Sequence, residues 1–306
     1  MNGLELARRY FEEIGRPAFE SAFPQLFERM AFGLVGEGSE CFGFDDALSR
    51  DHDWGPAFCI WLTEADHRQY GAQVQAVYDS LPKDFAGFSA RSTAAQGCER
   101  VGCLSVDRWY ARYTGCPNGP QTLSEWRRIP EHFLATATNG AVFSDPLGAF
   151  TAVREHLLQY YPEDVRIKKI ANRAAIMAQA GQYNYPRCLA RGETVAAQLA
   201  KAEFIRAALS MVYLLNRRYA PFYKWMHRGM RGLEKLPRVQ ELIETLCTAD
   251  GTASVELIES ICLLTAAELG RQGLSEKRES FLEAHCAELM GHIGDPALRR
   301  THIMEE

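Results

Sequence analysis

Two short polar motifs in the first quarter of the chain carry the residues best suited to chemistry. Gly38 and Ser39 follow the apolar run 31–35, and Asp51 and Asp53 lie shortly before a second apolar run. Glycines let a backbone approach a phosphate closely, and a serine hydroxyl adds a hydrogen-bond donor. Paired carboxylates suit hard divalent cations such as Mg²⁺, which prefer oxygen ligands. In this order the motifs predict a metal-dependent site for nucleotidyl transfer.

A strand over 51–62 would place Asp51 and Asp53 on the same face. Residues two apart in a strand point the same way, with Cα atoms roughly 6–7 Å apart. Carboxylates so arranged could hold one or two Mg²⁺ ions, activating an attacking hydroxyl and neutralising a pyrophosphate leaving group. His52 would point to the opposite face. A His-Asp metal phosphohydrolase is the alternative, but the other histidines are poorly spaced for it.

The composition limits the classes of function. The 306 residues are 47% hydrophobic and 24% charged, as in soluble globular proteins, and suffice for one large or two ordinary domains. A net charge of -5 argues against a general nucleic-acid binder, although a local basic cleft stays open. No apolar run approaches the length of a membrane span, and no signal peptide is evident. Nine cysteines without a Cys-x-x-Cys pair indicate reduced thiols, so we expect a cytoplasmic protein.

The elements that must position the motifs change in character near residue 149. Before it, the pattern predicts a mixed α/β arrangement with helices at 4–14, 18–30, 64–81 and within 107–137, and strands at 31–36, 51–62, 101–106 and 141–143. After it, the pattern predicts long helices at 149–160, 164–181, 193–219, 222–231, 237–248, 253–270 and 274–291. The predicted class is α+β, a small mixed-sheet domain over 1–148 followed by an all-helical bundle over 149–306.

Several segments together resemble a known superfamily. They are Gly38-Ser39, Asp51-His52-Asp53-Trp54-Gly55, 139–145, 160–162, 181–185 and 215–225. The chain resembles the polymerase-beta-like nucleotidyltransferases, whose hallmark is Gly-Ser, a spacer and Asp-x-Asp. More closely, it resembles a bacterial family of uncharacterised nucleotidyltransferase-like proteins with a helical C-terminal domain similar to that of kanamycin nucleotidyltransferase. The resemblance covers most of 25–235. It implies a short mixed sheet flanked by helices, then a helical bundle closing the cleft.

The third carboxylate of the superfamily is missing from its usual place. The corresponding stretch is 99–107, and the position expected to be acidic is Gly102. Glu99 or Asp107, near the two ends of this predicted strand, could complete the metal site. Otherwise the site operates with two carboxylates, or catalysis has been lost.

The helix predicted over 193–219 carries a polar stripe at spacings of three and four: Glu203, Arg206, Ser210, Tyr213 and Arg217. One interpretation is a solvated face. The other is a cleft wall, with Arg206 or Arg217 on phosphate and Glu203 as acceptor or general base.

A mixed aromatic and polar cluster follows this stripe. We predict that Asn216, with Tyr213 and Arg217, contacts the nucleotide, and that Lys224 meets its triphosphate. An ordinary corner between helices is the alternative. The aromatic segment 181–192, expected to be a loop, is a candidate rim of the acceptor site.

The prediction is a Mg²⁺-dependent nucleotidyltransferase that moves AMP from ATP to a hydroxyl of a small-molecule acceptor. Fold analogy with antibiotic-modifying enzymes is the reason for preferring a small molecule. The alternatives are a catalytically weakened nucleotide-binding regulatory or interaction protein, and a nucleotidyltransferase acting on protein or RNA. In residues 235–306 the pattern indicates only packing or a partner surface.

Overall fold

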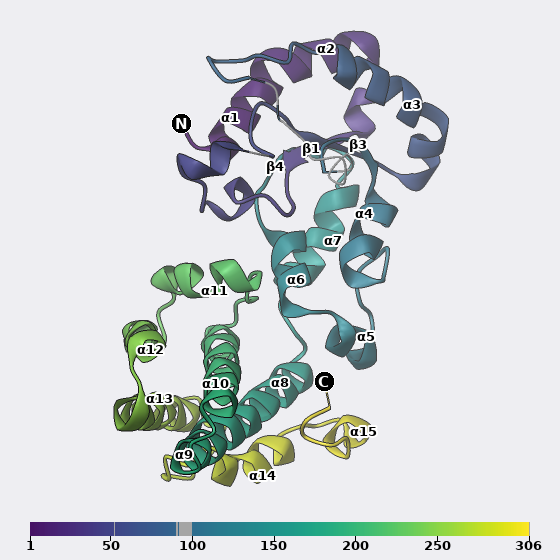
Figure 1. The fold of residues 1–306 in the computed structure, drawn as a ribbon. Coiled ribbons are helices and arrows are strands. Elements are labelled where there is room, and N and C mark those ends of the chain that lie inside the picture. The colour runs from purple at the N-terminus through teal and green to yellow at the C-terminus, as the bar shows by residue number, and fades with distance from the viewer. Residues whose placement is uncertain (52, 90, 92–99, 306) are drawn as a thin grey trace. The chain divides into compact units, whose positions relative to one another are not determined.

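A computed structural model describes residues 1–51, 53–89, 91 and 100–305 of the chain (Figure 1). The chain folds into two units, each formed by two separate segments. The sheet unit comprises 1–121 and 133–159, and the helical unit comprises 122–132 and 160–306. The prediction of an α+β protein with a helical part is confirmed. The predicted boundary after Gly148 does not coincide with this division.

The sheet unit is built on a four-stranded mixed sheet with the order β3-β2-β1-β4. Strand β1 pairs antiparallel with both β2 and β4, whereas β2 and β3 are parallel. The strands are β1 (Ala31–Leu34), β2 (Cys59–Leu62), β3 (Gly102–Ser105) and β4 (Ala141–Ser144).

Helices surround this sheet, and aromatic rings form much of its core. Phe11, Phe32 and Phe58 are fully buried and pack against one another. The chain is helical without interruption from α1 through a π-helical segment into α2, so the predicted break near Gly15 is absent. The helices are α1 (Gly3–Tyr10), η1 (Phe11–Gly15), α2 (Arg16–Ala22), α3 (Glu64–Ser80), α4 (Val106–Thr114) and α7 (Ala149–Leu158), with α6 (Glu131–Thr138) beginning in the helical unit.

The predicted strand over 51–62 is wrong in its first half, because β2 begins only at Cys59. Residues Leu48–Asp51 form a 3-10 helix, and the backbone of Asp53 is left-handed with φ 52°. Gly55 also has a positive φ of 147°. These dihedral angles are incompatible with an extended strand, so alternation does not determine how the two aspartates point.

The helical unit contains one long helical stretch that passes from α8 through a π-helical segment into α9. Helix α10 follows it as a separate helix. The predicted loop over 181–192 is therefore wrong, since helix continues to Ala190. Gly181 serves close packing: a Cβ there would lie 2.3 Å from the Phe204 ring. The helices are α5 (Leu123–Arg128), α8 (Glu163–Ile176), η5 (Met177–Asn184), α9 (Tyr185–Ala190), α10 (Thr194–Leu215), α11 (Tyr223–Gly229), α12 (Pro237–Thr248), α13 (Gly251–Arg271), α14 (Glu283–Gly291) and α15 (Pro296–Arg299).

Within the described residues, no helix combines the length and apolar character needed to span a bilayer. The eight cysteines in this part of the chain are free thiols, and four of them are buried.

Candidate functional site

The Gly-Ser turn and the aspartate segment lie at one end of the strands, here called the sheet edge. Because β1 and β2 are antiparallel, with Gly33 opposite Cys59, the end of β1 adjoins the start of β2. The starts of β3 and β4 reach the same edge, since Gly102 pairs with Cys59 and Ala141 pairs with Leu34. Four strand ends therefore surround the turn that follows β1.

Asn139 fixes the start of that turn. Its amide nitrogen donates to the Gly36 carbonyl at 2.6 Å, and its side-chain oxygen accepts from the Gly36 amide at 2.9 Å. Ser39 begins the short 3-10 helix Glu40–Phe42 without capping it through its side chain. The Ser39 hydroxyl is thus not engaged in a local cap.

A chain of alternating charges lies beside the turn. Arg100 bonds to Asp53 at 2.7 Å and pairs through Nε with Glu37 at 3.2 Å. Arg112 also reaches Glu37, at 3.3 Å. The second carboxylate oxygen of Asp53 is buried and has no hydrogen-bond partner within the described residues. These strand ends therefore combine two guanidinium groups with one buried carboxylate oxygen of Asp53 that has no hydrogen-bond partner within the described residues.

Gly38 is required here for a steric reason that spacing did not reveal. The carboxylate of Glu40 folds over it, and a Cβ on Gly38 would lie 2.4 Å from that group. Glu40 is itself buried and pairs with the buried guanidinium of Arg91 at 3.0 Å. The turn thus packs against an ion pair beneath it.

The predicted metal ligands do not all come together. Asp51 is exposed at the end of its 3-10 helix, whereas Asp53 is half-buried. Asp107 follows the other end of β3, so the parallel pairing with β2 separates it from Asp53. Glu99 and His52 lie outside the described residues. Across the described ranges, no three His, Cys, Asp or Glu side chains form a group that could hold a metal ion.

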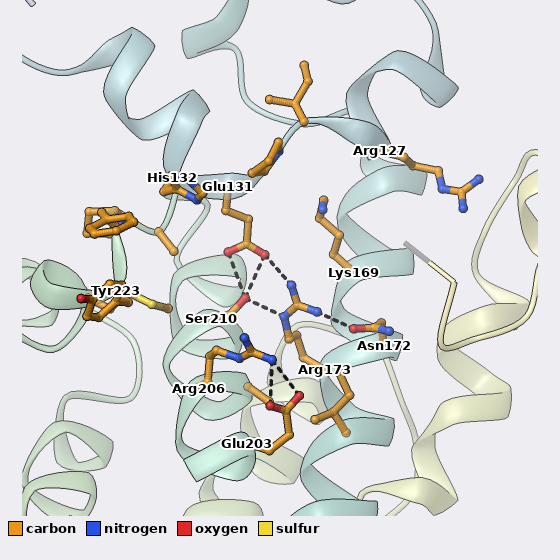
Figure 2. Close-up of a pocket in the computed structure, with 18 of the residues that line it drawn as sticks. Arg127, Glu131, His132, Lys169, Asn172, Arg173, Glu203, Arg206, Ser210 and Tyr223 are labelled. Carbon is orange, nitrogen blue, oxygen red and sulfur yellow. Dashed lines mark hydrogen bonds and ion pairs between the residues drawn. The ribbon is translucent and has the colours of Figure 1, made fainter. Parts of the chain in front are cut away.

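The helical unit contains a pocket of about 720 Å³ (Figure 2). Its walls come from the segment 127–132, from α8, from α10 and from residues 220–226. The polar and aromatic lining comprises Arg127, Arg128, Glu131, His132, Lys169, Asn172, Arg173, Glu203, Arg206, Ser210, Phe222 and Tyr223.

A hydrogen-bonded cluster crosses this pocket from α6 to α8 and α10. The Glu131 carboxylate accepts from Arg173 at 3.0 Å and from the Ser210 hydroxyl at 2.9 Å. Arg173 also donates through Nε to the Ser210 oxygen at 2.8 Å, and through Nη1 to the Asn172 side-chain oxygen. Burial lowers the pKa of His132, and the nearby Glu131 carboxylate offsets part of this effect. The net lowering of the pKa favours the neutral imidazole.

The pocket takes only part of the predicted polar stripe. The pocket lining includes Glu203, Arg206 and Ser210. Within it, the Glu203 carboxylate pairs with the Arg206 guanidinium at 2.7 Å. Tyr213 is buried, with its hydroxyl donating to the Met226 carbonyl at 2.7 Å, and does not line the pocket. Tyr213 shares the helical face of Arg206, but it lies about two turns further along α10, where its side chain packs against α11.

Three further predicted residues also make other contacts. Asn216 closes α10 and bonds to the backbone of Lys235 at 2.8 and 3.0 Å. Arg217 pairs with Glu163 at 2.8 Å. Lys224 is exposed, and its ammonium lies 5.1 Å from the Trp225 ring centroid. The structure does not bring these side chains to the pocket.

Sequence reasoning missed the contribution of α8. Lys169, Asn172 and Arg173 share one helical face at spacings of three and four, and Lys169 and Asn172 are almost fully buried. The signal was the density of cationic and amide side chains in a helix whose other residues are mostly apolar. Because such side chains are rarely buried without partners, this pattern indicates an internal site.

Comparison with known proteins gives one match to a family. Residues 126–226 match a domain of unknown function (DUF4037), a segment that includes every residue lining the pocket except Met304. No curated protein and no solved structure matches the chain.

Proposed function

We propose that the chain is a Mg²⁺-dependent nucleotidyltransferase that moves AMP from ATP to a hydroxyl of a small-molecule acceptor. The observation that carries the proposal is the meeting of two segments at one sheet edge. The turn from Gly36 to Ser39 follows β1, and the segment containing Asp51 and Asp53 precedes its antiparallel neighbour β2. A phosphate-binding turn beside carboxylates is the arrangement that this reaction needs.

Asp53 supplies a suitable donor for a magnesium ion. One of its oxygens is buried without a hydrogen-bond partner within the described residues, and carboxylate oxygen is the ligand that Mg²⁺ prefers. Asp51 is exposed two residues earlier in the chain and is the second carboxylate of the proposed site. Bound Mg²⁺ would supply positive charge to the α-phosphate and help to ionise the acceptor hydroxyl.

The residues of this edge would bind and orient the triphosphate. Gly38 lets the turn pack over the Glu40 carboxylate, and the Ser39 hydroxyl can donate to a phosphate. Arg100 and Arg112 add guanidinium groups, which match phosphate oxygens in geometry and charge. The ion pairs with Glu37 and Asp53 hold these cations beside the turn.

Pyrophosphate release from ATP tests the proposal, with Mg²⁺ present and small molecules from a cell extract as acceptors. We expect Asp53→Asn to lower the rate at least about 100-fold, because charge stabilisation in such sites is worth several kcal/mol. Asp84→Asn is the matched control, since Asp84 is exposed in the same unit. An unchanged rate in Asp53→Asn would rule out this site.

The second candidate is a nucleotide-binding regulatory protein without turnover. The 2.7 Å bond between Arg100 and Asp53 favours it, because a protein cation already neutralises that carboxylate. Equilibrium binding of ATP with no pyrophosphate release, in every acceptor pool, would select this alternative.

A further inference from the structure

Lys169 is a buried cation that faces a pocket. Its residue is only 3% exposed, yet it lines the cavity of the helical unit, as Figure 2 shows. Within the part of the chain that the structure describes, its ammonium has no hydrogen bond or ion pair. Its neighbour is the ring of Tyr161, whose centroid lies 5.5 Å away.

The adjacent lysine provides the contrast. Lys168 is buried to 1% exposure and does not line the pocket. Its ammonium donates to the carbonyls of Thr301 at 3.4 Å and His302 at 2.6 Å. The fold therefore satisfies one buried lysine with backbone oxygen and leaves the other directed toward an open volume.

The pocket as a whole is cationic. Five lining side chains are Lys or Arg and two are Glu, although the chain carries a net charge of -5. Both carboxylates are already engaged, Glu131 by Arg173 and Glu203 by Arg206. Neither is paired with Lys169. Arg127 pairs with Glu305 at 3.2 Å, while its buried Nε lacks a hydrogen-bond partner within the described residues.

An ammonium that opens only onto a pocket and has no carboxylate partner is costly, and an anion that pairs with it offsets that cost. We propose that this pocket binds an organic phosphate, with the phosphate group against Lys169. The volume of about 720 Å³ far exceeds inorganic phosphate and lies in the range of small-molecule sites. The exposed rings of Phe222 and Tyr223 provide a wall on which a sugar or base can pack. This site lies within the helical unit and is independent of the nucleotidyl-transfer proposal.

Calorimetric titration at constant ionic strength, without Mg²⁺, tests this site with inorganic phosphate, ribose 5-phosphate, AMP and ribose. We expect both organic phosphates to bind more tightly than inorganic phosphate, and ribose not to bind. Tighter binding of AMP than of ribose 5-phosphate identifies the ligand as a nucleotide. Equal affinity for the two identifies it as a sugar phosphate. Binding of ribose equal to that of ribose 5-phosphate would overturn the proposal.

Lys169→Met should weaken the organic phosphates about tenfold or more, because a charge-assisted hydrogen bond is lost. Lys168→Met is the matched control and should retain affinity, as should Asp84→Asn in the sheet unit. If Lys169→Met does not fold, Arg127→Gln replaces it, with an expected loss of about threefold or more. Unchanged affinity in the folded variant would overturn the assignment of the phosphate to this wall.

Discussion

At the scale of single residues, burial decides what each ion pair of the helical unit contributes. The side chains of Arg173 and Glu131 are 13% and 11% exposed, whereas those of Arg206 and Glu203 are 69% and 43% exposed. Water screens the second pair and leaves the first largely unscreened. The two pairs line the same pocket, so they form an internal comparison.

We therefore expect Glu131→Gln to lower the free energy of unfolding by about 3 kcal/mol, since it leaves Arg173 buried without its anion. Glu203→Gln should cost less than about 1 kcal/mol. Urea unfolding followed by circular dichroism measures both. Equal losses in the two variants would contradict the role assigned to burial.

A second residue-scale prediction concerns Glu64 at the start of α3. Hydrogen bonds from Arg108, and then from Ser105, lower its pKa from 4.5 to about 2. A carboxylate whose pKa is depressed by folding stabilises the native state above its unfolded pKa. That contribution is lost as pH falls from about 4.5 toward 2. Carbon-detected NMR titration of Glu64 should show this depressed pKa.

Arg108→Gln should raise the pKa of Glu64 toward its ordinary value. Arg68→Gln is the control and should raise it less, since the bond from Arg68 contributes less to the lowering. Equal shifts in the two variants would show that Arg108 is not the principal cause.

At the scale of elements, the approach of α10 to the long helical stretch depends on one missing side chain. A Cβ on Gly181 would lie 2.3 Å from the ring of Phe204, which is fully buried and cannot move aside freely. Gly181→Ala should therefore destabilise the protein by about 1–3 kcal/mol, as overpacking does.

Thermal unfolding compares Gly181→Ala with Gly232→Ala, where an added Cβ meets nothing within 4 Å. The control should unfold near the wild-type temperature. If Gly181→Ala kept the wild-type melting temperature, α10 would be able to move away from residue 181 with no loss of stability.

The same elements show where sequence reasoning succeeds. Apolar periodicity located the four strands approximately and predicted the helix over 237–248 with the bounds observed. It failed at 51–58, where left-handed backbone at Asp53 interrupts the expected strand, and at 181–190, where glycine allows close packing within a helix. Spacing alone does not distinguish a turn glycine from a packing glycine.

The candidate sites were predictable to different degrees. The Gly-Ser and aspartate motifs are local in sequence, so their position before and after neighbouring strands could be inferred. The pocket joins Glu131, Lys169 and Ser210 from three separate helices. Such a meeting depends on tertiary packing, which a single-sequence pattern does not contain.

At the scale of the whole molecule, neighbours in sequence and neighbours in space differ. Residues 122–132 lie between two segments of the sheet unit along the chain, yet they belong to the helical unit. Trp126 in this segment is 3% exposed and packs edge-on against Tyr161 at 5.8 Å.

Trp126→Ala should thus destabilise the helical unit, by about 3–5 kcal/mol. Amide hydrogen exchange read by mass spectrometry should show lost protection in peptides from α8, which packs against α5. Peptides from α4, closer in sequence, should keep their protection. Loss in α4 with none in α8 would contradict the division into units.

The discontinuity of both units has a consequence for inheritance and for engineering. The chain passes from one unit to the other after residues 121, 132 and 159, and the second passage falls inside helix α6. A single recombination event, which joins one contiguous stretch to another, cannot transplant the helical unit intact. Residues 160–306 moved alone would leave behind Glu131, and with it the anion that Arg173 and Ser210 contact. The two units would thus be inherited together, as one piece.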